Sequence, residues 1–326
     1  MNVLEQYKNL VWPFYKDYLE KNLTDNFHRQ IIMDYPLRQG KYLRPALVMM
    51  TAGALGVDKD TVIPTAAAMQ MSEDWILNHD DIEDDSEQRR GDMSLHKKIG
   101  IPLALNAGDA LHALNWQLIH SLKNEKLFTE FSKILNQTIA GQTYEIKFIE
   151  DKNFDLNYEQ VYKIIETKTC YYTISGPMRL GAILANCTDE QLQSIYNFGL
   201  ALGKAFQIID DYLDLTSDFE GQKKQIGNDI YEGKRTVFLV HLLQHDKDPK
   251  ILEILKKDRS HKTPSDVDYI INAMKKNKSL EYGYQLAADF AATARHLFET
   301  DLLFLNREPY RQQLALTIDF IVDRKK

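Results

Sequence analysis

Cysteine, glycine and proline are all scarce in this chain of 326 residues. The two cysteines, Cys170 and Cys187, show no CxxC spacing, which argues against a disulfide framework and favours a reducing compartment. We therefore predict a cytoplasmic protein. The 15 Gly and 9 Pro are fewer than average usage gives, which favours long helices over a turn-rich β architecture.

The chain also lacks a positive net charge and a long hydrophobic run. Its formal net charge of -7 argues against nucleic acid or an anionic membrane surface as the main partner. No apolar run approaches the ~18 residues of a membrane-spanning helix. The N-terminal sequence MNVLEQYKNLVWPFYKDY carries acids and aromatics where a signal peptide has an apolar core. We expect no integral membrane segment and no nucleic-acid partner.

Apolar residues instead recur at helical spacing along most of the chain, most clearly over 188–216. Thr188 and Gln191 resemble a capping box at the start of that segment. Further helices are predicted over 3–22, 41–56, 60–83, 102–123, 127–150, 157–168, 171–185, 230–245, 264–276, 279–299 and 307–322. No segment shows the alternation of a strand, and neither a linker nor a repeat divides the chain. The prediction is an all-α fold in a single domain, residues 1–326.

Two acidic elements share the pattern DDxxD, and each follows an apolar helical segment. They lie in HDDIEDDSEQRRG over 79–91 and in FQIIDDYLD over 206–214, and each sets two aspartates four positions apart on one helix face. The carboxylates are Asp80, Asp81, Asp84, Asp210, Asp211 and Asp214. Acids this close repel one another or draw in a cation, and Mg²⁺ prefers carboxylate, water and phosphate oxygens. One such motif is commonly a solvated helix end, but two predict walls that clamp a diphosphate through Mg²⁺.

A diphosphate also needs fixed cations, and basic residues occur close to both acidic elements. GKYLRP supplies Lys41 and Arg44 at the head of a helix, where backbone N–H groups also favour anions. The other candidates are Arg89 and Arg90 in RRG, Lys168 with Thr169 in ETKTCYY, and Lys224 and Lys234 around GNDIYEGKRT. Each alone is typical of a solvated surface, and only their co-occurrence with the acids indicates a diphosphate site.

The motifs GKYLRP, DDIEDDSEQRRG, TKT, FQIIDDYLD and GNDIYEGKRT, in this order over 40–236, resemble those of the trans-type isoprenyl diphosphate synthases. The resemblance implies a large helical bundle of the isoprenoid synthase type with a deep central cavity, usually assembled as a homodimer. It also implies a Mg²⁺-dependent prenyltransferase. Such an enzyme adds isopentenyl diphosphate head-to-tail to an allylic diphosphate, here dimethylallyl, geranyl or farnesyl diphosphate.

The resemblance assigns roles residue by residue. Three Mg²⁺ ions would be held principally by Asp80, Asp84 and Asp210, with Asp81, Asp211 and Asp214 in support. The allylic diphosphate would be held by Arg89, Lys168, Thr169, Gln207 and Lys234, with Lys224 as a further lysine. The isopentenyl diphosphate would be held by Lys41, Arg44 and Arg90. The terminal Arg324, Lys325 and Lys326 resemble a basic tail that closes over that site in some members.

One residue departs from the family pattern. Seven positions before the first aspartate, where the family usually has His or Gln at the isopentenyl diphosphate site, this chain has Glu73. A carboxylate facing a diphosphate is repulsive unless it is protonated or paired with Lys41 or Arg44. We therefore expect Glu73 to lie at this site and to alter binding there.

Residues before the first acidic element bear on product length. Trp75 lies five positions before Asp80, about 7.5 Å along the helix axis. An aromatic residue here, with no insertion in DDIED, resembles the pattern of family members whose products stop near twenty carbons. The alternative interpretation is that Trp75 packs between helices, which is the more common role of a tryptophan. Ile76 is smaller than the second aromatic residue that some fifteen-carbon enzymes have beside the first. Ser72, about one turn before Trp75, is too small to block a growing chain. The prediction is geranylgeranyl diphosphate, with farnesyl or longer products as alternatives.

Three other functions remain open from the sequence. A class I terpene cyclase also uses a DDxxD motif, but its second metal motif normally differs and it needs no isopentenyl site. A non-catalytic partner subunit tends to lose one DDxxD, and both are present here. A structural helical protein with acidic patches would show no activity and only weak Mg²⁺ binding.

Overall fold

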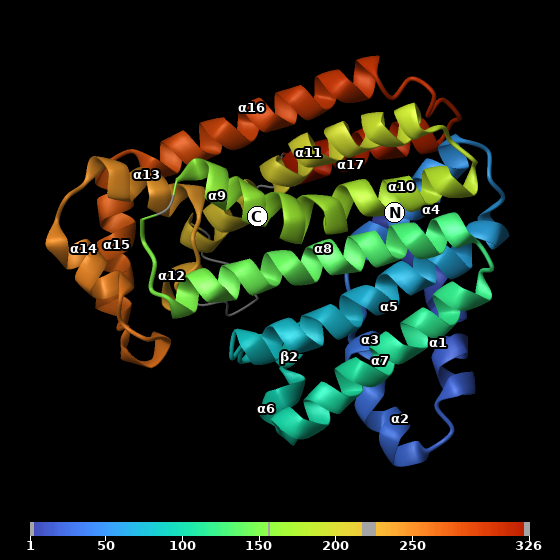
Figure 1. Ribbon diagram of the computed structural model, residues 1–326, viewed down its shortest axis with the longest axis horizontal. Coiled ribbons are helices and arrows are strands. Elements are labelled where there is room, and N and C mark those ends of the chain that lie inside the picture. The colour runs from blue at the N-terminus through green and yellow to red at the C-terminus, as the bar shows by residue number, and fades with distance from the viewer. Residues whose placement is uncertain (1–2, 156, 217–225, 323–326) are drawn as a thin grey trace. The chain divides into compact units, whose positions relative to one another are not determined.

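The computed structural model describes residues 3–155, 157–216 and 226–322 (Figure 1). The first half of the chain contains α1 (Val3–Asn22), α2 (Asn26–Ile32), α3 (Asp34–Arg38), α4 (Leu43–Ala54), α5 (Lys59–Glu83), β1 (Gln88–Arg89), β2 (Asp92–Met93), α6 (Leu95–Ile99), α7 (Ile101–Ser121) and α8 (Glu125–Glu150). The second half contains α9 (Tyr158–Ile164), the π-helix η1 (Ile165–Ser175), α10 (Gly176–Leu184), α11 (Asp189–Thr216), α12 (Asn228–Glu232), α13 (Val237–His245), α14 (Pro249–Leu255), the 3₁₀ turn η2 (Arg259–His261), α15 (Pro264–Lys276), α16 (Ser279–Thr300) and α17 (Tyr310–Val322).

The all-α prediction is confirmed, and most long helices begin and end within a few residues of the predicted positions. The predicted capping box before α11 is present. The backbone N–H of Gln191 donates to Thr188 Oγ1 at 3.4 Å, and that of Thr188 donates to Gln191 Oε1 at 3.0 Å. Short helices such as α2, α3, α6 and α14 were not predicted, because five to seven residues hold too few turns to show a period.

Three local predictions are wrong. The prediction of no strand fails at β1 and β2, which pair antiparallel with Arg89 opposite Asp92. The predicted break near residue 170 is absent, because the chain continues through the π-helix η1. The single helix predicted over 230–245 is interrupted at Gly233, whose φ of 78° ends α12, and Thr236 caps the start of α13.

The described residues divide into two compact units. Unit 1 takes Met1–Lys133, Gly176–Gln193 and Phe304–Leu314, and unit 2 takes Ile134–Ser175, Ser194–Leu303 and Ala315–Lys326. The single-domain organisation therefore stays a prediction. No helix in the described part of the chain combines the length and apolar character needed to cross a membrane. Both cysteines are free thiols.

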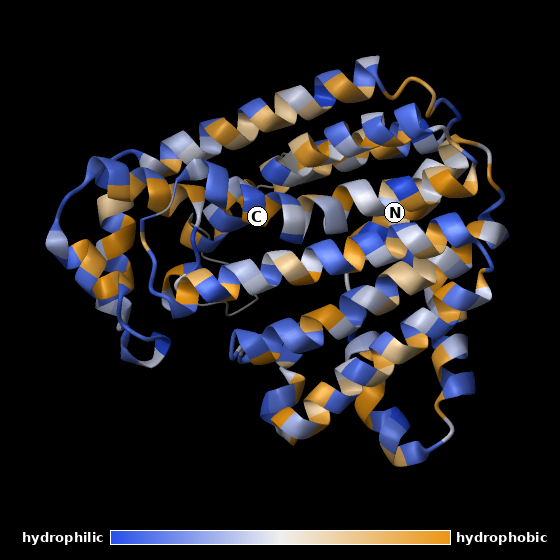
Figure 2. Ribbon diagram, viewed as in Figure 1, coloured by the Kyte–Doolittle hydropathy of each residue, from blue (hydrophilic) through white to orange (hydrophobic). Residues whose placement is uncertain are grey.

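Helix α5 is the central element of unit 1 and packs against α1, α4 and α7. Its middle is buried, and Ala66, Ala67 and Ala68 are fully inaccessible. Helix α10 lies so close to α4 that a Cβ on Gly181 would be 2.5 Å from the carbonyl oxygen of Val48. Figure 2 shows how the apolar middle of α5 gives way to hydrophilic residues at its C-terminal end. The buried part of α5 thus fixes the end that carries the first acidic element.

Unit 2 is built around α13, which packs against α9, α15 and α16. The buried side chains of α13 include Val237, Phe238 and Leu242. Helix α11 approaches η1 through small residues, since a Cβ on Gly203 would lie 2.6 Å from the Cα of Cys170. This close packing fixes the residues of η1 against the C-terminal half of α11.

Candidate functional site

The first acidic element forms the C-terminal end of α5 in unit 1. Asp84 is the C-cap residue, and its backbone N–H donates to the carbonyl oxygen of Asp80 at 2.8 Å. Asp80 and Asp84 therefore lie one helical turn apart on one face, as the sequence predicted. The side chain of Asp80 is 20% exposed, and one of its oxygens lies 3.4 Å from Arg89 Nη2.

Asp81 points away from this face and is fully buried. Its Oδ1 accepts a hydrogen bond from Arg89 Nε at 2.8 Å and another from Arg89 Nη2, and its Oδ2 accepts one from the Tyr35 hydroxyl. Although burial disfavours the charge, Asp81 and Asp80 raise the pKa of Arg89, so the guanidinium stays protonated. Because both oxygens of Asp81 are occupied, this geometry disfavours Asp81 as a metal ligand and makes it the partner of Arg89.

Arg89 and Arg90 lie on the hairpin formed by β1 and β2. Its two-residue turn, Arg90 and Gly91, has φ values of 52° and 81°. Positive φ at both positions is the type I′ geometry that matches the strand twist, and it costs a residue other than glycine roughly 1–2 kcal/mol. An arginine held in this conformation indicates that its side chain is needed at this place.

The Arg90 side chain reaches a pair of carboxylates on α5. Arg90 Nη1 lies 2.7 Å from Asp74 Oδ1, and Nη2 lies 3.2 Å from Glu73 Oε1. The other Glu73 oxygen lies 3.1 Å from Arg44 Nη1. The structure thus brings together three residues that the sequence assigned to the isopentenyl diphosphate site: Arg44, Glu73 and Arg90. A Cβ on Gly40 would lie 2.8 Å from Arg90 Nη2, so the glycine of GKYLRP leaves room for this guanidinium.

Asp74 was not predicted to belong to this group, and it is the most buried member. Its Oδ2 accepts a hydrogen bond from the Tyr15 hydroxyl at 2.9 Å, and its Oδ1 accepts one from Gln70 Nε2 at 3.2 Å. Burial raises the pKa of Asp74, while Arg90 opposes that rise. Asp74 is anchored on several sides, whereas Glu73 is held by the two arginines. Lys41, the remaining predicted cation, is exposed just before α4.

The second acidic element forms the C-terminal part of α11 in unit 2. Asp210 is exposed, Asp214 is half-buried and Asp211 is buried. Gln207 Nε2 donates to Asp211 Oδ1 at 2.7 Å, and Gln207 Oε1 accepts from Thr169 Oγ1 at 2.8 Å. These bonds place the predicted Thr169, Gln207 and Asp211 in one chain that joins η1 to α11.

Lys168 and Thr169 lie within the π-helix η1, an arrangement that is frequent at functional sites. Lys168 Nζ forms an ion pair with Glu145 of α8. Gly141, one turn earlier on α8, faces η1 so closely that a Cβ there would be 2.6 Å from the backbone nitrogen of Lys168. The small residue allows α8 to bring Glu145 to the lysine.

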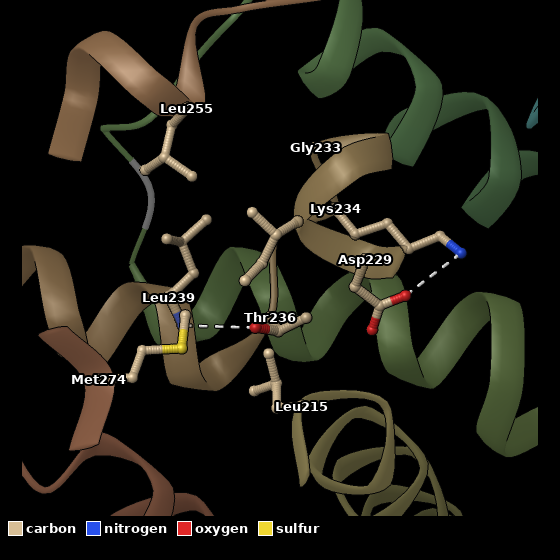
Figure 3. Close-up of a pocket in the computed structure, with 9 residues that line it drawn as sticks. Leu215, Asp229, Gly233, Lys234, Thr236, Leu239, Leu255 and Met274 are labelled. Carbon is tan, nitrogen blue, oxygen red and sulfur yellow. Dashed lines mark hydrogen bonds and ion pairs between the residues drawn. The ribbon is translucent and has the colours of Figure 1, made fainter. Parts of the chain in front are cut away.

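Asp229 of α12 joins the second acidic element, although the sequence did not single it out. Its backbone N–H donates to Asp214 Oδ2 at 3.0 Å, and its own Oδ1 lies 3.6 Å from Lys234 Nζ (Figure 3). Burial raises the pKa of Asp229 to about 7, with Lys234 opposing the rise. Burial and the neighbouring Asp229 also raise the pKa of Asp211 well above its usual range. Lys234 also pairs with Glu232 at 2.7 Å.

A small cavity of about 10 Å³ lies beside Asp229 and Lys234 (Figure 3). Apolar side chains line most of it, namely Leu215, Ile230, Leu239, Leu255 and Met274. This volume is close to that of a single water molecule, so the cavity is too small for a prenyl chain. The deep central cavity that the family resemblance implies stays a prediction.

Arg235 supports the turn that carries Lys234. It is buried, and its guanidinium donates to the carbonyl oxygens of Gly233, of Phe148 at 2.8 Å and of Asn153 at 2.8 Å. Its guanidinium also lies 4.0 Å from the centre of the Phe154 ring. Sequence reasoning did not find this role. Arg235 follows the predicted ligand Lys234 directly, and no local pattern distinguishes a structural arginine from a ligand there.

The residues predicted to set product length lie in the buried part of α5. Trp75 is 5% exposed, and its ring centroid lies 5.7 Å from that of His79 and 4.7 Å from that of His112 on α7. Trp75 therefore packs against α7, in agreement with the alternative interpretation that it packs between helices. Ile76 is half-buried and lies one turn before Asp80 on the same face. Ser72 is fully buried, and its hydroxyl donates to the carbonyl oxygen of Met69 at 2.7 Å.

The carboxylates of each unit suit a metal that arrives together with a phosphate ligand. Over residues 3–155, 157–216 and 226–322, no three His, Cys, Asp or Glu side chains lie in an arrangement that could hold a metal ion on their own. Mg²⁺ usually takes one or two carboxylates and completes its octahedron with water and substrate phosphate oxygens. Asp80 with Asp84, and Asp210 with Asp214, match that donor set. Lys224 and the tail Arg324 to Lys326 lie outside the described residues.

The chain is similar to known proteins over most of its length. The sequence profile described as polyprenyl synthetase matches residues 27–274. A short chain isoprenyl diphosphate synthase of Methanocaldococcus jannaschii is 34% identical over 223 residues, which are 66% of this chain and 67% of that protein. A geranylgeranyl diphosphate synthase of Sulfolobus acidocaldarius is 30% identical over 304 residues, which are 90% of this chain and 91% of that protein.

Solved structures share the fold over nearly the whole chain. A geranylgeranyl pyrophosphate synthetase from Pyrococcus horikoshii has a TM-score of 0.86 at 27% identity and covers 99% of this chain and 98% of its own. A geranylgeranyl pyrophosphate synthase from Corynebacterium glutamicum, complexed with isoprenyl diphosphate and magnesium, has a TM-score of 0.88 at 22% identity, with 99% of both chains covered. The chain belongs to the polyprenyl synthetase family, and it is an enzyme, a prenyltransferase.

Proposed function

We propose that this chain is a short-chain trans-prenyl diphosphate synthase that condenses isopentenyl diphosphate with an allylic diphosphate, with geranylgeranyl diphosphate as the product. One observation in unit 1 carries the proposal. The hairpin directs Arg89 to the acidic end of α5 and the next residue, Arg90, to the group that contains Arg44. Two adjacent cationic groups suit a reaction that binds two diphosphates. The named relatives are short-chain isoprenyl and geranylgeranyl diphosphate synthases.

The allylic diphosphate is assigned to the two acidic elements together. Asp80, Asp84 and Asp210 would hold Mg²⁺, with Asp214 in support. Bound there, the metal supplies positive charge that stabilises the leaving diphosphate. Arg89, Lys168 and Lys234 are the cations that stabilise the same charge as the allylic C–O bond breaks. The chain of Thr169 and Gln207 fixes Asp211 beside Asp210.

The isopentenyl diphosphate is assigned to Lys41, Arg44 and Arg90. Its double bond attacks the allylic cation to form the new C–C bond, and the proton lost from the product goes to the released diphosphate. No side-chain general base is therefore needed. The apolar helices of the bundle keep water from the cation, which would otherwise be trapped as an alcohol.

A homodimer is part of the proposal. Within unit 1, α7 and α8 expose large apolar side chains, including Ile101 at 51%, Leu105 at 40% and Phe128 at 45%. Scattered apolar side chains are common on surfaces, but Ile101 and Leu105 lie one turn apart on the same face of α7 and suit a contact with a second copy. Light scattering of the purified protein should give twice the monomer mass, and Ile101→Asp should shift it towards the monomer.

The direct test is product analysis. The purified chain is incubated with Mg²⁺, isopentenyl diphosphate and dimethylallyl, geranyl or farnesyl diphosphate in turn, and the products are sized by chromatography. Prenyl diphosphates of about twenty carbons, abolished by a chelator, are expected from at least one primer. A cyclic hydrocarbon formed without isopentenyl diphosphate would identify a terpene cyclase instead, and no product from any primer would indicate a non-catalytic subunit.

A further inference from the structure

Arg38, the last residue of α3, has a largely buried side chain although no step of the proposed reaction uses it. Its side chain is 8% exposed, and its guanidinium lies 4.8 Å from the centre of the Tyr35 ring. Nη1 donates to the carbonyl oxygen of Arg89 at 2.9 Å, and Nη2 donates to that of Met93 at 2.8 Å. One guanidinium therefore ties both strands of the β1–β2 hairpin to α3.

The hairpin needs such an external contact because it is too short to hold itself. Each strand has two residues, and the ladder consists of two residue pairs. Isolated two-stranded hairpins are marginal in water even when they are longer. The turn adds strain, since Arg90 has a φ of 52°. Charge-assisted bonds to backbone carbonyls are among the stronger hydrogen bonds available to such a segment.

The position of these bonds bears on both diphosphate groups. The Arg89 carbonyl belongs to the peptide bond that links Arg89 to Arg90, so Arg38 fixes the peptide plane from which both side chains depart. The Arg89 side chain turns to Asp81 and Asp80, and the Arg90 side chain turns to Asp74 and Glu73. A rotation of this peptide would move both guanidinium groups together.

Two carboxylates orient Arg38 itself. Nη2 forms an ion pair with Asp34 within α3 and lies 3.9 Å from Asp92 of β2. Lys98 of α6 contacts the same two carboxylates, Asp34 at 3.2 Å and Asp92 more closely. Lys98 and Arg38 thus contact the same two carboxylates, Asp34 and Asp92. The hydrogen bonds to the backbone carbonyls of the hairpin described above come from Arg38.

We propose that Arg38 is a positioning residue that fixes the hairpin, so that Arg89 and Arg90 bind the two diphosphates from one rigid support. This inference rests on the proposed function, because that function assigns the two arginines to the two substrates. It adds that the two substrate sites share one anchor. A change at Arg38 should therefore weaken the binding of both substrates, whereas a side chain at Gly40 would press on the Arg90 guanidinium.

Arg38→Met tests the proposal, because methionine keeps an unbranched stem over the Tyr35 ring and removes the donors. The Michaelis constants for isopentenyl and allylic diphosphate are each expected to rise about tenfold, with a smaller change in kcat. Hydrogen exchange of the peptide covering residues 86–95 should become faster. Lys98→Met is the matched control: it removes a cation from the same two acids, and wild-type constants and exchange are expected. Arg38→Lys, which keeps the charge and some donor capacity, should lie between Arg38→Met and wild type.

Several results would overturn the inference. Unchanged hairpin exchange in Arg38→Met would show that Arg38 is not the anchor, and a rise in only one Michaelis constant would show that the sites do not share it. Equal effects of Arg38→Met and Lys98→Met would assign the effect to charge loss alone. If Arg38→Met does not fold, Arg38→Lys is compared with Lys98→Met in its place, with the same measurements. A wild-type protein without synthase activity would overturn the proposed function, and it would be recognised before any variant is measured.

Discussion

The two acidic elements balance their negative charge in different ways. In the first, Asp81 receives Arg89 and Tyr35, so a permanently charged guanidinium offsets the buried carboxylate. In the second, Asp211 is buried and Asp229 is half-buried, and the charge of Lys234 acts on both. Burial raises both pKa values, that of Asp229 to about 7. The Asp229 charge adds to the rise for Asp211, and Asp214, Glu232 and Asp210 add to the rise for Asp229. A cation compensates the first cluster, whereas the second cluster carries two carboxylates whose pKa values are raised.

This difference indicates how each cluster prepares for a metal-bound diphosphate. The Asp80 side chain is 20% exposed and lies 3.4 Å from the permanently charged Arg89, so a cation faces this carboxylate even without a metal. The second cluster must lose a proton before all of its carboxylates carry charge, and metal binding to carboxylates releases protons. An arginine compensates the first cluster, whereas the raised pKa values of Asp211 and Asp229 predict that metal binding by the second cluster depends on pH.

The largest expected effect follows from removing one carboxylate of either cluster. Asp80→Ala and Asp210→Ala should each lower kcat about 10²–10³-fold or more, since each removes charge stabilisation from the same leaving group. Thermal unfolding should change little, because Asp80 is partly exposed and Asp210 is exposed. Steady-state kinetics with each variant measures this. Near-wild-type turnover in either one would exclude a clamp made by both clusters.

A stability effect should follow from the raised pKa of Asp229, about 7 in the folded protein against 3.8 for the free side chain. Between these values the folded state binds more protons than the unfolded state, so the free energy of unfolding falls as pH rises from about 4 to 7. Without metal, Asp229→Asn should remove part of this fall and stabilise the protein at pH 8 by roughly 1–3 kcal/mol, since one pKa unit is ~1.4 kcal/mol.

Chemical denaturation at pH 5 and pH 8, in a chelator, measures the Asp229→Asn effect. Asp210→Asn gives a graded comparison, because the Asp210 charge is one of the smaller causes of the raised pKa of Asp229 and its loss should reduce the pH dependence only in part. An identical pH dependence in wild type and Asp229→Asn would show that the second cluster is not compensated by protonation.

A smaller effect is expected at Glu73, which lies between Arg44 and Arg90. Glu73→Gln removes a carboxylate that competes with the diphosphate for both guanidinium groups. The Michaelis constant for isopentenyl diphosphate should fall several-fold, about 1 kcal/mol, while that for the allylic substrate stays nearly constant. Asp74→Asn is a useful contrast, because this residue is held by Tyr15 and Gln70 and should affect stability more than affinity. Equal changes for both substrates would place Glu73 outside this site.

The smallest energetic effect concerns product length. Trp75→Ala should allow at least one additional isoprene unit, because one helical turn of ~5.4 Å is close to the length of that unit. Ile76→Ala is the comparison, since Ile76 lies on the face of Asp80 and Trp75 contacts His112. Chromatography of the products distinguishes them. Longer products from Ile76→Ala but not from Trp75→Ala would show that Ile76, and not Trp75, limits the product length.

The sequence was sufficient for the fold class and for most members of each cluster. Long amphipathic segments such as α5 and α11 carry their period over many turns, and the DDxxD spacing places two carboxylates on one helix face whatever surrounds them. The predicted side-by-side arrangement of Asp80 and Asp84 followed from helical geometry alone. Thr169 was a candidate from its own sequence motif, and Gln207 came only from the family resemblance. The hydrogen bond between these two side chains was not predicted.

What the sequence could not reveal depends on tertiary contacts. Arg38, Asp74 and Arg235 act through backbone carbonyls or buried partners distant in the sequence, and no local pattern marks such contacts. The orientation of Asp81 away from Asp80 follows from helix rotation, but its partners Tyr35 and Arg89 come from other elements. The β1–β2 hairpin has two residues per strand, too few to show alternation.

The most direct test of the account is the binding of inorganic diphosphate with and without Mg²⁺, measured by calorimetry on wild type, Asp80→Ala and Asp210→Ala. We predict that Mg²⁺ tightens binding to the wild type and that either substitution removes most of this gain, because both clusters hold metal on one diphosphate. In buffers of different ionisation enthalpy, the wild type should also release protons near pH 7. A full Mg²⁺-dependent gain in either variant would contradict the account, since one cluster would then bind the metal diphosphate alone.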